Sequence, residues 1–167
     1  GGGGGQGGRG AGYYWNGNNA FIDIQTTITS MQGGGGKRDE MTAGGLCGFG
    51  TLLDPSITTA DNLSGQVLAK KGELPEVRTE CSIEIHLMKN MVAGDDDEPD
   101  TIHPLRNNEM LMVNVATSTS VGVVKGVEKG KANLQLRLPI CADQGQRVSL
   151  SRRVGARWRL IGHGTIL

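Results

Sequence analysis

The 167-residue sequence has few aromatic residues, few cysteines and no long apolar run. Aromatic side chains make up 4% of the chain, and no apolar stretch approaches the roughly 20 residues that a membrane-spanning helix needs. The first residues have neither the basic nor the apolar region of a secretory signal. Cys47, Cys81 and Cys141 include no CxxC pair, which disfavours a zinc or disulfide scaffold and suits a reducing compartment. We therefore expect a cytoplasmic protein without a membrane anchor.

Motifs for nucleotide binding are also absent from the sequence. A phosphate-binding loop needs a glycine five positions before its Gly-Lys pair and a serine or threonine after it. Gly36-Lys37 is instead preceded at that distance by Met31 and followed by Arg38. No NKxD guanine-recognition motif occurs either. We therefore expect no cofactor in this segment, and we interpret residues 33–40 as a hairpin loop.

The residues that hydrolytic enzymes and metal sites use show no familiar spacing. His86, His103 and His163 lie in different segments, with no HExxH or i,i+4 pair, and no GxSxG motif occurs. The acidic segment 94–100 lacks the central glycine and the distal glutamate of a calcium-binding loop. These absences predict a binding module with no catalytic residues and no metal site.

Glycine is abundant and unevenly distributed. The first 50 positions hold 18 of the 28 glycines, which leaves 10 for the other 117. Residues 1–19 combine glycine with Tyr13, Tyr14 and Trp15 and contain no stretch that can bury a core, so we predict that they are disordered. Such a segment could be a flexible tether, or it could bind RNA loosely through stacking, although Arg9 is its one basic residue.

Charge is also unevenly distributed, although the net charge is zero. From Lys125 onward, nine Lys/Arg stand against two acidic residues, a net charge of +7, whereas residues 1–124 carry eight Lys/Arg against fifteen acidic residues, a net charge of −7. A basic C-terminal third suits a partner that carries phosphate or an acidic surface. A solvated charged face is the alternative.

The remaining chain shows the pattern of many short strands. Residues 21–29 alternate apolar and polar side chains, and Gly, Pro or Asn/Asp clusters separate the later segments at near-regular spacing. The predicted strands after Ala43 cover residues 46–53, 66–70, 81–88, 110–115, 120–127, 133–138, 147–152 and 158–166. A short helix is an alternative for 84–92. This pattern is typical of an all-β barrel protein.

Specific motifs appear in one order over residues 44–162. They are Gly44-Gly45-Leu46, Gly48, Gly50-Thr51, Asp54-Pro55, Ala60-Asp61, Gly65-Gln66-Val67-Leu68, Leu74-Pro75-Glu76, Asn108-Glu109-Met110-Leu111-Met112-Val113-Asn114-Val115, Leu150-Ser151-Arg152-Arg153-Val154 and Trp158-Arg159-Leu160-Ile161-Gly162. With these motifs the chain resembles the gamma subunit of eukaryotic and archaeal translation initiation factor 2, a relative of elongation factor Tu. Cys47 and Phe49 depart from the family pattern, which usually has aliphatic residues there.

The resemblance implies an all-β protein with two β-barrels after the glycine-rich residues 1–19. Residues 20–75 would be the C-terminal part of the family's second domain, and residues 76–167 its third domain. The family's GTP-binding domain, which would hold GTP and Mg²⁺, and the first strands of the second domain are not in the sequence.

The resemblance also implies a function. The chain would be the non-catalytic barrel part of a GTPase factor that, with GTP, binds methionyl initiator tRNA and delivers it to the small ribosomal subunit. Its partners would be that tRNA, the alpha and beta subunits of the same factor, and the ribosomal subunit. The alternatives are an elongation-type or selenocysteine-type factor and a stand-alone glycine-rich RNA-binding protein.

A first candidate site surrounds Phe49. Gly48 and Gly50 bracket this residue in a segment of strand character, where glycine indicates a bulge or a close backbone approach. The resemblance implies that Gly48, Phe49, Gly50 and Thr51 form a loop that faces the GTP-binding domain and the acceptor end of the tRNA.

A second candidate site contains three arginines. Arg152, Arg153 and Arg157 are candidate contacts with RNA or with another subunit. Arg152 and Arg153 are adjacent in a predicted strand, so their side chains point to opposite faces. We therefore expect at least one of them to brace the barrel and not to face a partner.

Overall fold

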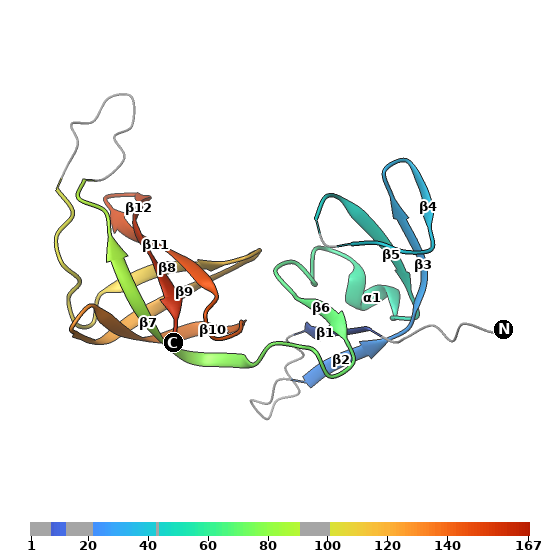
Figure 1. Ribbon diagram of the computed structural model, residues 1–167, viewed down its shortest axis with the longest axis horizontal. Coiled ribbons are helices and arrows are strands. Elements are labelled where there is room, and N and C mark those ends of the chain that lie inside the picture. Colours follow the sequence, from blue (N-terminus) through green and yellow to red (C-terminus); the bar gives the residue numbers. More distant parts are fainter. Residues whose placement is uncertain (1–7, 13–21, 43, 91–100) are drawn as a thin grey trace. The chain divides into compact units, whose positions relative to one another are not determined.

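The computed structural model describes residues 8–12, 22–42, 44–90 and 101–167. The chain divides into two compact units, Gly1–Leu74 and Pro75–Leu167 (Figure 1). Nearly all regular structure in both units is β-strand, as the sequence pattern predicts. Within the described residues, no helix is long and apolar enough to cross a membrane.

The first unit contains two three-stranded antiparallel sheets and one short helix. One sheet has the order β2-β1-β6, with β2 at Ile22–Thr26, β1 at Gly8–Gly12 and β6 at Leu68–Lys70. The other has the order β4-β3-β5, with β4 at Gly36–Arg38, β3 at Ile28–Gly33 and β5 at Cys47–Thr51. Helix α1 spans Pro55–Thr58. The single strand predicted at 21–29 is interrupted at Thr27, which separates β2 from β3.

One expectation for the first unit is met in an open form, and another is corrected. The partial barrel predicted for residues 20–75 consists of two three-stranded sheets in the described residues, and no described side chain of residues 24–74 is buried. The predicted disorder of residues 1–19 is wrong for Gly8–Gly12, which pair with both β2 and β6. Glycine keeps both backbone hydrogen-bonding groups, so a strand can form without the side-chain pattern by which it is recognised. Residues 1–7 and 13–19 lie outside the described residues.

The glycine run at 33–36 forms a hairpin, as predicted. Gly34 and Gly35 connect β3 to β4 with φ angles of 56° and 91°, conformations that favour glycine. The acidic segment 94–100 lies outside the described residues.

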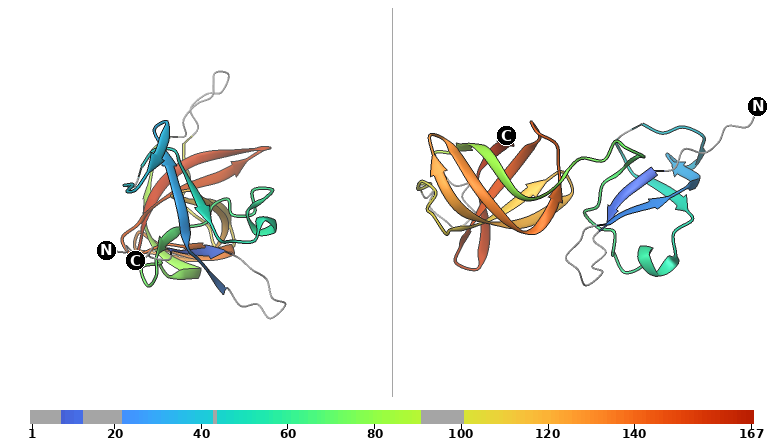
Figure 2. Two further views of the ribbon diagram at one scale, coloured as in Figure 1. Left: turned by 90° about the vertical axis from the view of Figure 1, so that its right-hand side faces the viewer. Right: turned by 90° about the horizontal axis from the view of Figure 1, so that it is seen from below.

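The second unit is a closed six-stranded antiparallel barrel with the order β10-β7-β12-β11-β8-β9 (Figure 2). Its strands are β7 at Val77–Leu87, β8 at Met110–Val115, β9 at Ser118–Glu128, β10 at Lys131–Cys141, β11 at Arg147–Val154 and β12 at Arg157–Ile166. Every strand predicted after residue 80 is present, and most extend further than predicted. The helical alternative for 84–92 is wrong for 84–87, which belong to β7; residues 91 and 92 lie outside the described residues.

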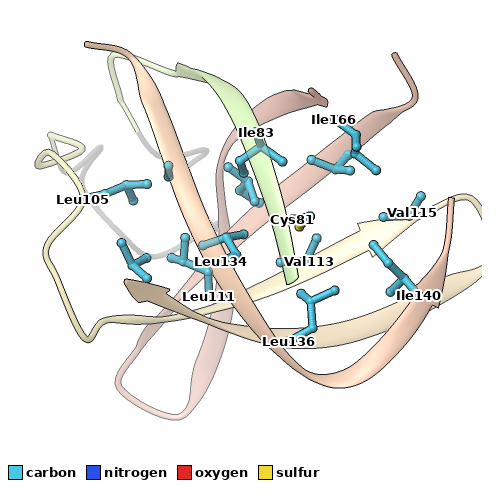
Figure 3. Close-up of a cluster of buried hydrophobic side chains, with 14 of the residues drawn as sticks. Cys81, Ile83, Leu105, Leu111, Val113, Val115, Leu134, Leu136, Ile140 and Ile166 are labelled. Atoms are coloured by element: carbon cyan, nitrogen blue, oxygen red, sulfur yellow. The ribbon is translucent and has the colours of Figure 1, made fainter. Parts of the chain in front are cut away.

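Alternation along these strands builds the core of the barrel. Figure 3 shows apolar side chains from β7, β8 and β10 converging inside it, among them Ile83, Leu111 and Leu134. Ser120 is the one buried polar residue among the described residues, and its hydroxyl donates to the carbonyl of Leu138 (2.6 Å). The polar group is therefore satisfied, and the interior is otherwise apolar.

Burial also sets the chemistry of Cys81, which lies in this core. Desolvation raises the pKa of its thiol to about 11, and the nearby Arg78 opposes that shift. The thiol therefore stays protonated at neutral pH and acts as a small apolar group, as expected for a structural cysteine.

Two glycines let β12 close the barrel against β7. A Cβ atom at Gly162 would collide with the carbonyl oxygen of His86 and would lie 3.0 Å from the Cα of Leu87. A Cβ atom at Gly164 would lie 2.7 Å from the carbonyl oxygen of Glu84. Because these neighbours are backbone atoms, a side chain at either position would force the strands apart.

We predict that Gly162→Ala lowers the free energy of unfolding by about 1–3 kcal/mol, the usual cost of overpacking. Gly126→Ala in β9 is the matched control, because a Cβ atom there meets nothing within 4 Å. Urea denaturation of both variants measures the difference. Equal stability of the two variants would show that the β7–β12 contact tolerates a side chain.

Candidate functional site

The residues Gly48, Phe49, Gly50 and Thr51 lie in a strand and not in the predicted loop. They belong to β5, which pairs with β3 at one edge of its sheet. The pairing has a bulge: Thr51 is opposite Ile28 and Gly50 is opposite Ser30, so that Thr29 is the extra residue. The backbone irregularity that the two glycines suggested is therefore present, on the strand that faces them.

Phe49 and Thr51 share one face of β5 and line an apolar groove. The groove has a volume of about 330 Å³ and also includes Ile24 from β2, Leu63 from the segment that follows α1, and Leu68 from β6. Phe49 remains 38% exposed within it. The glycines point to the other face of β5, since successive strand residues alternate.

The two glycines differ in the space around them. A Cβ atom at Gly50 would collide with the hydroxyl oxygen of Ser30 and would lie 3.0 Å from that of Thr29, so a side chain there would force these exposed hydroxyl groups to turn away. A Cβ atom at Gly48 would meet Gln32 Cβ at 3.9 Å, an ordinary contact. Nothing in the described fold therefore demands glycine at position 48.

A short helix borders the same groove. Asp54 caps α1 by accepting a hydrogen bond from the backbone N–H of Ser56 (2.8 Å), and Pro55 begins the helix. Hydrogen bonds from Ser56 hold the pKa of the Asp54 carboxyl below its usual value. The cap fixes the start of α1, whose last residue, Thr58, lines the groove.

Arg152 anchors the segment before β8 to the barrel wall. Its guanidinium forms a bidentate ion pair with the carboxylate of Glu109, and both side chains are mostly buried, at 15% and 17% exposure. It also donates to the carbonyl oxygens of His103 (3.0 Å) and Pro104 (3.3 Å). Glu109 in turn accepts from the backbone N–H of Arg106 (3.0 Å). This geometry gives Arg152 a structural role.

Arg153 and Arg157 lie at the exposed end of the β11–β12 hairpin. β11 pairs with β8 as far as Arg152, and β12 pairs with β7 from Gly162 onward. Residues 153–158 therefore pair only with one another in the described structure, and we call them the ribbon (Figure 1). Arg153 donates to the carbonyl of Gly155 (3.3 Å) at the turn.

Strand register distributes the ribbon's side chains over two faces. Arg153 is opposite Trp158 on one face, and Val154 is opposite Arg157 on the other. Arg153, Val154 and Arg157 are exposed, and Trp158 is half-buried. The structure thus places Arg157 on one face of the ribbon and, on the other, Arg153 beside an indole that the prediction left out. The WRLIG motif contained that residue, but its position opposite Arg153 depends on the hairpin register.

Comparison with known proteins adds a family assignment to this geometry. Residues 79–166, nearly the whole barrel, match the family model described as "Initiation factor eIF2 gamma, C terminal". Translation initiation factor 2 subunit gamma of Methanothermobacter thermautotrophicus is 47% identical over 150 residues, which cover 90% of this chain and 36% of that protein. The chain belongs to the initiation factor 2 gamma family.

Other gamma subunits align over nearly the same region. Those of Methanococcus maripaludis and Thermococcus kodakarensis are 46% and 42% identical and cover 88% and 87% of the chain, and 35% of each relative. The chain therefore spans about a third of the length of the curated relatives it matches. The closed barrel is the C-terminal domain of a gamma subunit, which confirms the resemblance seen in the motifs.

We predict that Arg152→Ala lowers the free energy of unfolding by about 1.5–3 kcal/mol, because it leaves Glu109 and two carbonyl groups without their charged donor. Arg153→Ala, one residue further, should change it by less than about 0.5 kcal/mol. Thermal and urea denaturation of the gamma-subunit segment measure both. If Arg153→Ala destabilises as much as Arg152→Ala, the assignment of the brace to Arg152 is wrong.

Proposed function

We propose that this segment is the barrel part of a gamma subunit that, with GTP, binds methionyl initiator tRNA and delivers it to the small ribosomal subunit in the cytoplasm. Family membership carries this proposal. The alpha and beta subunits of the factor would be its protein partners. GTP and Mg²⁺ would be held by another part of the factor, because the 167 residues have no nucleotide-binding motif.

The ribbon is the surface in the barrel that best suits RNA. Two exposed guanidinium groups can bind phosphate oxygens, and the half-exposed indole of Trp158 can stack on an unpaired base. A two-stranded ribbon that pairs only with itself also has outer edges without a neighbouring strand in the described structure. Arg152 is excluded from this surface by its four described hydrogen bonds.

In the first unit, the edge of β5 suits a partner that approaches the backbone. Gly48 lies on an exposed edge strand, and the fold leaves room for a side chain there. A glycine that its own fold does not require is explained if a partner lies where a side chain would be. We propose that the acceptor end of the tRNA, or the GTP-binding domain that holds it, comes close at this point.

The Gly48 proposal is tested in the reassembled full-length factor. We expect Gly48→Val to weaken binding of methionyl initiator tRNA at least tenfold through steric obstruction, with an unchanged salt dependence because no charge is altered. Gly36→Val in β4 is the matched control, since it too has open space around it. Filter binding across a salt series measures both variants, and wild-type affinity of Gly48→Val would contradict the close approach.

The ribbon proposal predicts a different signature. Arg153→Ala and Arg157→Ala should each lower the slope of log K against log salt concentration by about one unit if they bind phosphate. Lys131→Ala on β10 removes an exposed charge outside the ribbon and should leave the slope unchanged. The same series measures binding of the factor to initiator tRNA and to small ribosomal subunits. An unchanged slope for both arginine variants with both RNAs rules the ribbon out as an RNA contact.

A further inference from the structure

His86 and His163 are 77 residues apart in the sequence and directly opposite each other in the barrel. The register of β7 and β12 pairs the two residues, and both side chains are exposed. Gly162 and Gly164 flank His163, and because they have no side chains, β12 lies directly against the backbone of β7 on the inner side. The same close approach that closes the barrel therefore fixes the two imidazoles as neighbours on its outer surface.

The two rings lie at a chelating distance. Their centroids are 5.2 Å apart and their planes are inclined by 28°. A metal–nitrogen bond of about 2.0–2.1 Å puts an imidazole centroid about 3.2 Å from the ion, so two rings at a tetrahedral angle have centroids about 5.2 Å apart. The rings must turn about χ2 to direct one nitrogen each at a common point. That torsion is broad for histidine, and both side chains are exposed.

In the described part of the chain, the two imidazoles stack on each other and form no hydrogen bond or ion pair. The side chains beside them on the outer face are Ser149 of β11, opposite His163, and Glu84 of β7, two residues before His86. Glu84 is opposite both Thr165 and Lys131. Two nitrogen ligands with open solvent on the remaining side favour a cation that accepts imidazole and completes its shell with water.

We propose that His86 and His163 form a two-histidine site for a borderline divalent transition-metal ion such as Ni²⁺ or Zn²⁺. Imidazole suits these ions, whereas Mg²⁺ and Ca²⁺ prefer oxygen ligands and should not bind here. The site is independent of the tRNA function proposed above, and it departs from the expectation that the chain has no metal site. The sequence does not reveal it because neither histidine has a ligand at motif spacing.

The test is calorimetric titration of the full 167-residue chain, made without a polyhistidine tag, with Ni²⁺ as the probe. Loss of a group that only supports a metal ligand lowers metal affinity roughly 10–100-fold. His86→Ala and His163→Ala each remove a ligand itself, so we expect each to weaken Ni²⁺ binding by at least that factor. The double variant should bind no more weakly than either single variant, because removing one histidine already destroys the chelate. Mg²⁺ should give no binding isotherm with any variant.

Two controls separate this site from other metal-binding groups. His103→Ala removes the third, exposed histidine and should bind Ni²⁺ like the wild type. Cys47→Ser removes the exposed thiol and should do the same. In the NMR spectrum, Ni²⁺ should broaden the amide resonances around His86 and His163 first. Equal affinity of wild type and both single variants, or losses that simply add in the double variant, would overturn the proposal.

Discussion

The close approach of β12 to β7 is the contact on which the second unit depends. It makes the sheet continuous, so every strand of the barrel has two neighbours and the aliphatic side chains of all six strands face one interior. Gly162 and Gly164 make it possible, because the backbone of β7 occupies the space where side chains would be. The same contact fixes which residues appear opposite each other on the outer surface and where β11 and β12 leave the barrel as the ribbon.

The two units are built with different amounts of buried apolar surface. The barrel contains all of the buried apolar residues among the described part of the chain, whereas the described side chains of residues 24–74 are at most half-buried. The folding free energy that comes from the hydrophobic effect grows with the buried apolar area, so the barrel contributes most of the chain's stability. The first unit instead offers exposed strand edges and an apolar groove, features by which it can bind a partner.

Sequence patterns predicted which segments form strands far better than which strands meet. Alternation identified β8 with its observed bounds, and it placed β10 and β12 correctly, because a side-chain period of two is a local property. Pairing is not local. The ion pair of Arg152 with Glu109 joins residues 43 positions apart, and the His86–His163 pair depends on strand register. The sequence did not predict β1, because glycines give no alternation of apolar and polar side chains. They pair through the backbone as well as other residues do.

The candidate sites show the same limit. The adjacency of Arg152 and Arg153 predicted that one of them braces the barrel, but the identity of the brace follows from the position of Glu109 at the entry to β8. In the same way, the two glycines around Phe49 indicated an irregular backbone. The structure then distinguishes Gly50, which faces the hydroxyl groups of Thr29 and Ser30 at the bulge, from Gly48, which has only an ordinary contact with Gln32.

Native-state hydrogen exchange of the full chain tests most directly the claim that barrel closure dominates this structure. Amides at the β7–β12 junction donate backbone hydrogen bonds between the two strands, such as the one from Met88 to the carbonyl of Ile161 (2.8 Å). They should exchange with the slowest rates in the chain, at the free energy of global unfolding, while the amides of β3, β5 and the ribbon exchange much faster. Exchange at the β7–β12 junction that is as fast as in the first unit, or slowest exchange in β3 and β5, would contradict this account.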